Sequence, residues 1–448
     1  MDPDLSIDLD TTTQEILLAA SNHDVAALKP FFRVPGAASV QDPETGFTPL
    51  HAAIAACGPV RSADSDSPKE SAPVREGDSG AGASNGELVD AEDAGHDEVD
   101  MERAKDTVRE LFLAGAIWND LDVGEETPGC LAWRLGQKEL YELVVEAGVR
   151  AEMLMNLMGG YERLQESDAD DDDADEGEEQ EEGSQEEDSD MIVEQTAGPG
   201  VQPETAADDD EKKDVNSADY LRSDLTFQDD KLLDADANGV MMSWETSIMS
   251  LTASLLAPSP GLRILNIGFG MGIIDRLFAA TSPSAHHIIE AHPAVLARLH
   301  DDSSDFGHTF DTSWRDAAVG NNVVHAGRWQ DVVPQLLEKG EVFDAIYFDT
   351  FGEDYAELKR FFADYVVGLL DENGRFSFFN GLGADRRVCY DVYCRVADLD
   401  LSDAGFQTEW KDVEVGDLGA EGEKEWAGVR RRYWTLDNYR LPVCRFLG

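Results

Sequence analysis

Basic residues and cysteines are scarce in this 448-residue chain, and no long apolar run occurs in it. The chain has 35 lysines and arginines against 93 aspartates and glutamates, a net charge of -58, which argues against direct binding of nucleic acid through a basic face. Its five cysteines are scattered and form no Cys-x-x-Cys pair, so we expect no metal site and a reducing compartment.

The start of the sequence is acidic and lacks the basic and apolar regions of a signal peptide. No apolar stretch approaches the roughly 18 residues that a membrane span needs. We therefore expect a soluble protein that has no contact with a membrane and is located in the cytoplasm and the nucleus.

The chain has two low-complexity segments, 59–100 and 161–215. The second separates a region at 1–160 from a region at 216–448, and the first is an insertion within 1–160. Residues 59–100 and 161–215 have few large apolar side chains, so they cannot bury enough surface to offset their ordering entropy, and we predict that both are disordered. The acidic runs of the second segment repel one another and favour an extended linker. An acidic arm that docks on a basic partner is the alternative.

The first region has helical periodicity and two similar local motifs. Thr48-Pro49-Leu50-His51-Ala52-Ala53 resembles the start of an ankyrin repeat, and a more degenerate copy begins at Thr127-Pro128. Helical spacing of apolar residues predicts helices over Thr13–Ala20, Asp24–Phe32, Ala104–Leu113 and Leu140–Ala147. Two imperfect repeats are too few to stand alone, so we expect the first helices or the C-terminal region to cover their open faces.

In the C-terminal region short apolar strands alternate with helices, which predicts an α/β doubly wound fold with a mostly parallel sheet. Two last strands have no clear helix between them and suggest an antiparallel C-terminal hairpin. The predicted strands are Arg263–Ile267, His287–Glu290, Val323–Ala326, Ala345–Asp349, Arg375–Phe379, Phe406–Val413 and Arg431–Leu436.

A glycine turn follows the first of these strands. Gly268, Gly270 and Gly272 lie between the strand and a helix, where glycines permit a tight turn and leave room for a ligand at the start of the helix. Ile273 stands where a dehydrogenase would have its third glycine. Glu290 ends the next strand 20 residues after Gly270, where a carboxylate can accept both ribose hydroxyls of a nucleoside. The alternative is that Glu290 only caps a helix.

One aromatic and one amide side chain follow the third predicted strand. Trp329 could stack on an adenine and Gln330 could bond to its edge, although a buried core tryptophan is the commoner explanation of such a motif.

Two carboxylates are candidates for the chemistry. Asp349 ends the fourth strand, at the sheet edge where open α/β folds bind ligands, and Glu245 lies in the segment Val240–Thr246, which we interpret as an entry helix. Two carboxylates in one cleft can hold a guanidinium, because its planar donors match their geometry. An exposed Glu245 and an Asp349 that only caps a helix are the alternatives.

These motifs together resemble the guanidinoacetate methyltransferase family. They are Met-x-x-Trp-Glu-Thr up to Thr246, Gly-Phe-Gly-Met-x-Ile at 268–273, Ile-Ile-Glu up to Glu290, Gly-x-Trp-x-Asp-Val at 327–332 and Tyr-x-Asp-Thr at 347–350. The ankyrin-like region and the string Phe379–Asp385 are similar to the fungal protein arginine N5-methyltransferases of this family.

The resemblance implies a class I S-adenosylmethionine-dependent methyltransferase that uses no metal. It implies cofactor contacts at Tyr220, Met249, Gly268, Phe269, Gly270, Met271, Gly272, Ile273, Glu290, Ala291, His292, Trp329, Gln330 and Asp349. Tyr220 departs from the tryptophan of the guanidinoacetate enzymes, and Asn380-Gly381-Leu382 replaces their Asn-Leu-Thr, which removes a hydroxyl near the small substrate and leaves space for a peptide.

The family further implies methylation of the δ (N5) nitrogen of an arginine in a large-subunit ribosomal protein, by a monomer. We expect Glu245 and Asp349 to be the catalytic residues, which orient the guanidinium and accept the released proton. A guanidino methyltransferase for small molecules and a non-catalytic ankyrin scaffold remain as alternatives.

Overall fold

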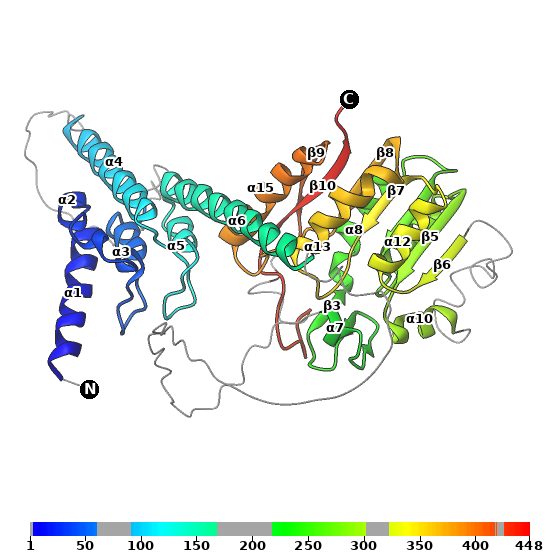
Figure 1. Cartoon of the computed structure of the whole chain (residues 1–448), viewed down its shortest axis with the longest axis horizontal. Helices are drawn as coiled ribbons and strands as arrows, with labels where there is room; N and C mark the ends of the chain where they lie inside the picture. Colours follow the sequence, from blue (N-terminus) through cyan, green and yellow to red (C-terminus); the bar gives the residue numbers. More distant parts are fainter. Residues whose placement is uncertain (1–2, 61–90, 168–216, 302–321, 417, 419–424) are drawn as a thin grey trace, which may run out of the picture.

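The computed structural model describes residues 3–60, 91–167, 217–301, 322–416, 418 and 425–448. Most of the two segments with predicted disorder, 59–100 and 161–215, lies outside these residues. Figure 1 shows a group of helices from the N-terminal region beside a sheet flanked by helices from the C-terminal region. No helix among the described residues is long and apolar enough to cross a membrane.

The N-terminal unit is helical, and two of its helices begin with the same local signal. Thr48 and Thr127 cap α3 and α5 with their side chains, and each is followed by a proline in the first turn. The ring of His51 bonds through Nε2 to the carbonyl of Glu126 at 3.0 Å, which ties one capped turn to the other. The assignment to ankyrin repeats stays a prediction. The helices are α1 Pro3–Ser21, α2 Val25–Leu28, α3 Pro49–Ala56, α4 Ala91–Leu113, α5 Pro128–Arg134 and α6 Lys138–Ser167, with 3-10 turns at Phe31–Arg33 and Ala37–Ser39.

Two of these helices extend into segments where composition predicts disorder. Helix α4 begins at Ala91, inside 59–100, and α6 continues to Ser167, beyond the predicted domain boundary at residue 160. A low apolar content measures what a segment can bury, whereas Ala, Glu, Met and Leu favour helix locally whether or not they are buried. Both helices also continue directly from stretches that pack in the core.

The C-terminal unit contains a seven-stranded sheet in the order β6-β5-β4-β7-β8-β10-β9. The pairs from β6 to β8 are parallel, whereas β10 is antiparallel to both β8 and β9. The prediction of a doubly wound class I methyltransferase fold with a C-terminal antiparallel hairpin is confirmed. The strands are β4 Arg263–Ile267, β5 Ala285–Glu290, β6 Asn322–Ala326, β7 Phe343–Phe348, β8 Leu370–Phe378, β9 Phe406–Glu414 and β10 Asn438–Phe446.

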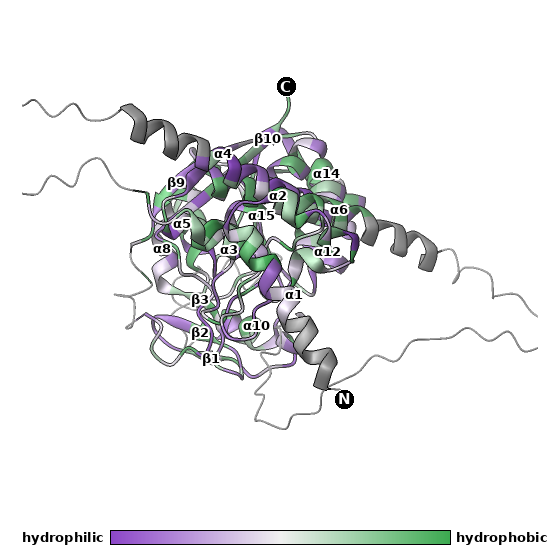
Figure 2. Cartoon of the chain, turned by 90° about the vertical axis from the view of Figure 1, so that its left-hand side faces the viewer, coloured by the Kyte–Doolittle hydropathy of each residue, from purple (hydrophilic) through white to green (hydrophobic). Residues whose placement is uncertain are grey.

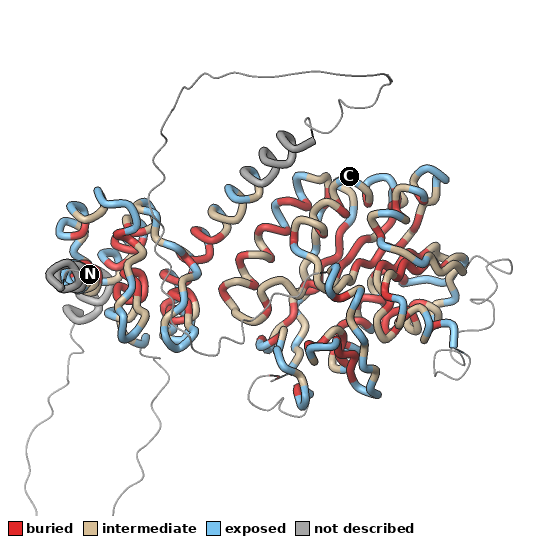
Figure 3. Tube along the Cα trace, turned by 60° about the horizontal axis from the view of Figure 1, so that its bottom comes forward, coloured by how far each residue is buried: buried red, intermediate tan, exposed pale blue. Residues whose placement is uncertain are grey.

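Helices cover both faces of this sheet. Because side chains alternate along a strand, Ile264 and Ala345 pack with α8 and α9 on one face, while Leu265 and Ile346 pack with α12 and α15 on the other. Figure 3 shows the buried residues concentrated along the strands and on the helix sides that meet them. These helices are α8 Thr246–Leu256, α9 Ile273–Ala280, α12 Trp329–Glu338 and α15 Arg387–Asp403.

The remaining elements are smaller. They include a three-stranded sheet, in which β1 pairs with β2 and β2 with β3. They are α7 Ser217–Tyr220, β1 Thr226–Phe227, β2 Lys231–Leu233, β3 Gly239–Met242, the 3-10 turn η3 Ser243–Glu245, α10 Pro293–His300, α13 Tyr355–Arg360, a π-helical turn Phe361–Val366 and α14 Val367–Leu369.

Two sequence predictions about these elements are wrong. The last strand lies at Asn438–Phe446 and not at Arg431–Leu436; Pro442 has no backbone N–H and weakens the strand pattern of a segment that nevertheless pairs on both sides. The segment Val240–Thr246 is mainly the end of β3 followed by one 3-10 turn, and the helix begins only at Thr246.

The two units meet where α5 and α6 pack on α15. An added Cβ at Gly129 would lie 2.5 Å from Cγ2 of Val388, and one at Gly148 would lie 2.6 Å from Cγ2 of Val392, so these glycines allow close approach. The hydroxyl of Tyr141 donates to Asp391 across the same seam. Figure 2 shows that helices at this end of the molecule carry both hydrophobic and hydrophilic residues, as helices with one buried side do.

Gly148→Ala should destabilise the protein because its methyl group overpacks the seam. Overpacking costs about 1–3 kcal/mol, which exceeds the roughly 1 kcal/mol that alanine gains over glycine in a helix. Urea unfolding of the full chain measures the loss. In the double variant with Val392→Ala the methyl group gains room, so the double variant should lose less than the sum of the single variants; simple additivity would contradict this packing.

Candidate functional site

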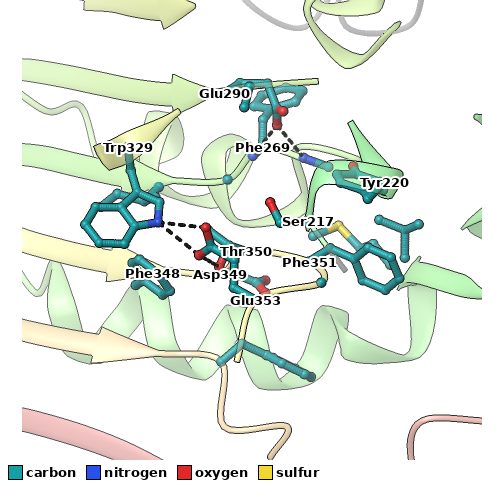
Figure 4. A pocket seen from close by; sticks show the side chains of 18 of the residues that line it. Ser217, Tyr220, Phe269, Glu290, Trp329, Phe348, Asp349, Thr350, Phe351 and Glu353 are labelled. Atoms are coloured by element: carbon teal, nitrogen blue, oxygen red, sulfur yellow. Dashed lines mark hydrogen bonds between the residues drawn. The ribbon is translucent and has the colours of Figure 1, made fainter. Parts of the chain in front are cut away.

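A cavity of about 270 Å³ lies at the carboxyl ends of β4, β5 and β7. Strand β4 comes first in the large sheet; the chain then moves outward to β5 and β6 before it returns to β7 on the other side of β4. Such a reversal leaves a crevice at the strand ends, where open α/β folds bind ligands. Figure 4 shows side chains from α7, the strand ends and the loop after β7 around this cavity.

The glycine turn after β4 forms one wall. Gly268 has a φ of +89°, and a Cβ at this position would lie 1.9 Å from the carbonyl oxygen of Asp349. No side chain fits there without separating β4 from β7. Gly272 has a φ of +67° and caps α9, so the turn delivers the chain directly to a helix N-terminus beside the cavity.

Glu290 holds this turn from the end of β5. Its Oε2 accepts a hydrogen bond from the backbone N–H of Phe269 at 2.9 Å, and its Oε1 accepts one from the N–H of His292 at 2.6 Å. Figure 4 shows the carboxylate facing the turn. Burial raises the pKa of Glu290, and the backbone donors oppose that rise. Oε2 also accepts a longer bond from the N–H of Gly270 at 3.5 Å, so the free lone pair for a ligand lies on Oε1.

His292 organises the segment before β1. Its Nδ1 accepts from the N–H of Ala294, so Nε2 carries the proton and donates to the carbonyls of Tyr220 and Ser223 at 3.1 and 3.2 Å. The ring of Tyr220 packs against His292 with centroids 4.8 Å apart. His292 therefore fixes Tyr220 over the cavity, and its own side chain is buried behind it.

Two carboxylates face the other end of the cavity. Glu245 ends the 3-10 turn after β3 and is only 3% exposed. Its Oε1 accepts from the N–H of Met242 at 3.0 Å and from the hydroxyl of Tyr433. Asp349 follows β7, and within the described residues its Oδ2 is shielded from solvent and has no hydrogen-bond partner.

Both carboxylates are difficult to ionise in the absence of a cation. Burial raises the pKa of Glu245 to about 8, with repulsion from Asp349 as a second cause. Burial likewise raises the pKa of Asp349 to about 7, with a contribution from the buried Asp275. A cation placed between them would be attracted to both carboxylates and would lower both pKa values.

Trp329 and Gln330 bond to a further carboxylate of the cavity, that of Glu353. The indole Nε1 of Trp329 donates to Glu353 at 2.9 Å, as the dashed lines in Figure 4 show, and Nε2 of Gln330 donates to Glu353 at 2.8 Å. Thr350 also donates to Glu353, at 2.7 Å. The ring of Trp329 is 3% exposed and packs edge-on to Phe348, so it is a core tryptophan whose rim borders the cavity.

The structure brings most of the predicted site residues to one cavity. Those that line it are Tyr220, Glu245, Gly268, Phe269, Gly270, Glu290, Ala291, Trp329, Gln330 and Asp349. Met249, Met271, Gly272, Ile273 and His292 lie outside the lining. Met249 packs under the sheet in the α8 core, the next three continue the turn into α9, and His292 acts through Tyr220.

Three residues that line the cavity are not among the predicted site residues. Tyr433 reaches Glu245 from 188 positions away, in a segment that the sequence analysis took for a strand. Glu353 follows the Asp-Thr motif but has no recognisable pattern of its own. Met241 contacts the turn, with its Sδ 3.2 Å from the N–H of Met271. The motif that ends at Thr246 contains Met241, which is the one available indication.

The chain is similar to known methyltransferases along nearly its whole length. The family model of guanidinoacetate N-methyltransferase matches residues 210–385. Protein arginine N-methyltransferase 2 of Gibberella zeae is 48% identical over 97% of this chain and 92% of that protein. The protein of the same name from Emericella nidulans is 46% identical over 99% of both chains, and that from Saccharomyces cerevisiae is 38% identical over 78% of this chain and 79% of that protein.

Glu245→Gln should stabilise the protein most at high pH. Because the folded-state pKa of Glu245 is raised to about 8, ionisation penalises folding increasingly as the pH rises from the unfolded pKa to the folded one. The gain of the variant over the wild type should be larger at pH 9 than at pH 6 by on the order of 2 kcal/mol. Urea unfolding at both pH values measures it. The exposed Glu372→Gln serves as control, and an equal effect of both variants would refute the assignment.

Proposed function

The chain belongs to the family of protein arginine N-methyltransferase 2, and we propose that it transfers one methyl group from S-adenosylmethionine to the δ-nitrogen of an arginine in a protein substrate. The observation that carries this proposal is the pair of carboxylates in the cavity beside the glycine turn, the buried Glu245 and the partly buried Asp349, whose Oδ2 is shielded from solvent.

The residues at the other end of the cavity fit a nucleoside cofactor. Gly268 leaves space against the backbone, Glu290 offers a lone pair on Oε1 to a ribose hydroxyl, and the N-terminus of α9 lies beside them. Trp329 borders the part of the cavity that follows the end of β6, where the adenine base would lie. When bound, S-adenosylmethionine supplies a reactive methyl group on a positively charged sulfur.

Glu245 and Asp349 would bind the guanidinium of the substrate. The guanidinium stays protonated near neutral pH, and its planar N–H groups match carboxylate oxygens. Its charge offsets the repulsion between the two acids, so they become better acceptors once the arginine is bound. The geometry then holds the nitrogen in place, and positioning of this kind supplies much of the acceleration of a bimolecular step.

One of the two acids would also accept the released proton. The new N–C bond forms as the S–C bond breaks, and the attacking nitrogen must lose its proton, because the product guanidinium keeps a single positive charge. Burial raises the pKa of both acids and so opposes the lowering by the bound guanidinium, which keeps them stronger proton acceptors than an ordinary carboxylate beside a cation.

A protein substrate fits the far rim of the cavity. Gly381 and Leu382 line it where the guanidinoacetate enzymes have bulkier and hydroxylated residues, and neither side chain can bind a small carboxylate. The helical N-terminal unit, docked on α15, would present the substrate as an ankyrin-like platform. The net charge of -58 favours a basic partner, for which we propose a ribosomal protein of the large subunit.

Labelled S-adenosylmethionine and a mixture of ribosomal proteins test the reaction directly. Fragmentation of the labelled peptide should place the methyl group on the δ-nitrogen. Free guanidinoacetate should remain unlabelled; its methylation would favour the small-molecule alternative. Cofactor binding without label in any substrate would favour the non-catalytic scaffold.

Glu245→Gln and Asp349→Asn should each lower kcat by about 100-fold or more, since each removes a proton acceptor and one charge of the guanidinium site. Binding of S-adenosylhomocysteine to the Glu245→Gln variant should change less than threefold, because this carboxylate faces the substrate end. Initial rates and calorimetry measure both effects, with Glu372→Gln as control. Full turnover in either site variant would remove that residue from the mechanism.

The KM for the protein substrate should fall as the pH rises. Glu245 must be ionised to bind the guanidinium, and its pKa of about 8 means that a proton is lost on binding below that pH. Between pH 6 and pH 8.5 we expect at least a tenfold decrease in KM, followed by a plateau. The profile should be flatter in Glu245→Gln. A pH-independent KM in the wild type would contradict the role of this acid.

A further inference from the structure

The carboxylate of Glu245 does not offer both of its oxygens to a ligand. Its Oε1 accepts two hydrogen bonds, from the N–H of Met242 at 3.0 Å and from the hydroxyl of Tyr433. A carboxylate oxygen has two lone pairs, so these donors saturate Oε1. Within the described residues, Oε2 is therefore the oxygen of Glu245 that remains for a substrate.

The position of the Tyr433 hydroxyl is fixed by its surroundings. An added Cβ on Gly239 would lie 3.0 Å from Cε1 of Tyr433, so the ring rests directly on β3. The ring of Trp426 also packs against that of Tyr433, with ring centroids 5.1 Å apart and planes near perpendicular. The next residues are anchored as well, since Trp434 is fully buried and Thr435 bonds to the carbonyl of Ala384 at 3.0 Å.

The number of free oxygens decides how a guanidinium can bind. A carboxylate with two free oxygens grips a guanidinium by two parallel bonds, either at the edge of the two terminal nitrogens or at the edge that includes the δ-nitrogen. The second grip covers the δ-nitrogen and exposes a terminal one. A carboxylate with one free oxygen cannot form either paired grip, so it must share the guanidinium with a second acid.

We propose that Tyr433 determines which nitrogen is methylated, because its hydroxyl restricts Glu245 to one free oxygen and so prevents the paired grip that would cover the δ-nitrogen. Glu245 then binds a terminal nitrogen through Oε2, and Asp349, whose Oδ2 has no hydrogen-bond partner within the described residues, is left to accept the proton that the δ-nitrogen loses as it attacks the methyl donor. This inference rests on the proposed function, in which these two acids hold the arginine.

Tyr433→Phe tests the inference, because it keeps the ring and removes only the hydroxyl. The purified full-length variant and the wild type are each incubated with labelled S-adenosylmethionine and with the unmethylated form of the protein that the wild type methylates. Enzyme is in excess, so that slow variants still form product. Fragmentation then gives the ratio of δ-methyl to terminal-methyl arginine. We expect the terminal fraction to rise at least about tenfold in Tyr433→Phe, as the loss of one charge-assisted bond implies.

Two further variants separate this role from a general one. Gly239→Ala displaces the ring without removing the hydroxyl and should shift the ratio in the same direction. Tyr439→Phe removes another buried hydroxyl, which accepts from the N–H of Asn380 at 2.9 Å and does not bond to Glu245, and should leave the ratio unchanged.

The outcomes distinguish the two proposals. A wild type that labels the δ-nitrogen, with the same ratio in Tyr433→Phe, overturns the role of Tyr433 and leaves the proposed function intact. Equal shifts in Tyr433→Phe and Tyr439→Phe also overturn it, because the effect would then be general. Label on terminal nitrogens in the wild type refutes the δ-nitrogen proposal itself, and the inference fails with it.

Discussion

The close approach of Gly268 to Asp349 is the constraint on which the rest of the site depends. The carbonyl oxygen of Asp349 occupies the space that any side chain at 268 would need, and the N–H of Asp349 continues the ladder by bonding to Ile267 at 2.9 Å. The glycine turn and the acid after β7 are thereby held in one rigid arrangement at the reversal of strand order. Glu290 and Glu245 reach that point from other elements, and the cavity lies between them.

The sequence predicts the parts of this arrangement that have a local signal. The parallel strands are found to within a few residues, apart from an earlier start of β8, because buried strands in an α/β fold are short apolar runs between turns. The glycine turn, Glu290 and Asp349 are found because they stand at strand ends. Tyr433 could not be found in this way, since its partner is 188 positions distant and its segment has no regular structure.

Burial raises the pKa of both acids and also costs stability. Glu245 is enclosed by an aromatic cluster in which Trp244 lies 5.8 Å from Trp434 and 6.3 Å from Trp426, centroid to centroid. Such packing excludes water and raises the pKa of the carboxyl, while the large apolar area of the tryptophans contributes the free energy that tolerates a buried acid. Trp426, Tyr433 and Trp434, which precede β10, therefore help to enclose the cavity, although they lie outside the parallel sheet.

The glycine and valine contacts at the seam between α6 and α15 restrict how descendants of this chain can diverge. A larger residue at 148 fits only when the residue at 392 is smaller, since Cγ2 of Val392 would lie 2.6 Å from the first added atom. A protein that carries only one of the two replacements is less stable than one that carries neither. The residue types allowed at these two positions are therefore coupled, so the helical unit and the C-terminal unit restrict each other's sequence across the seam.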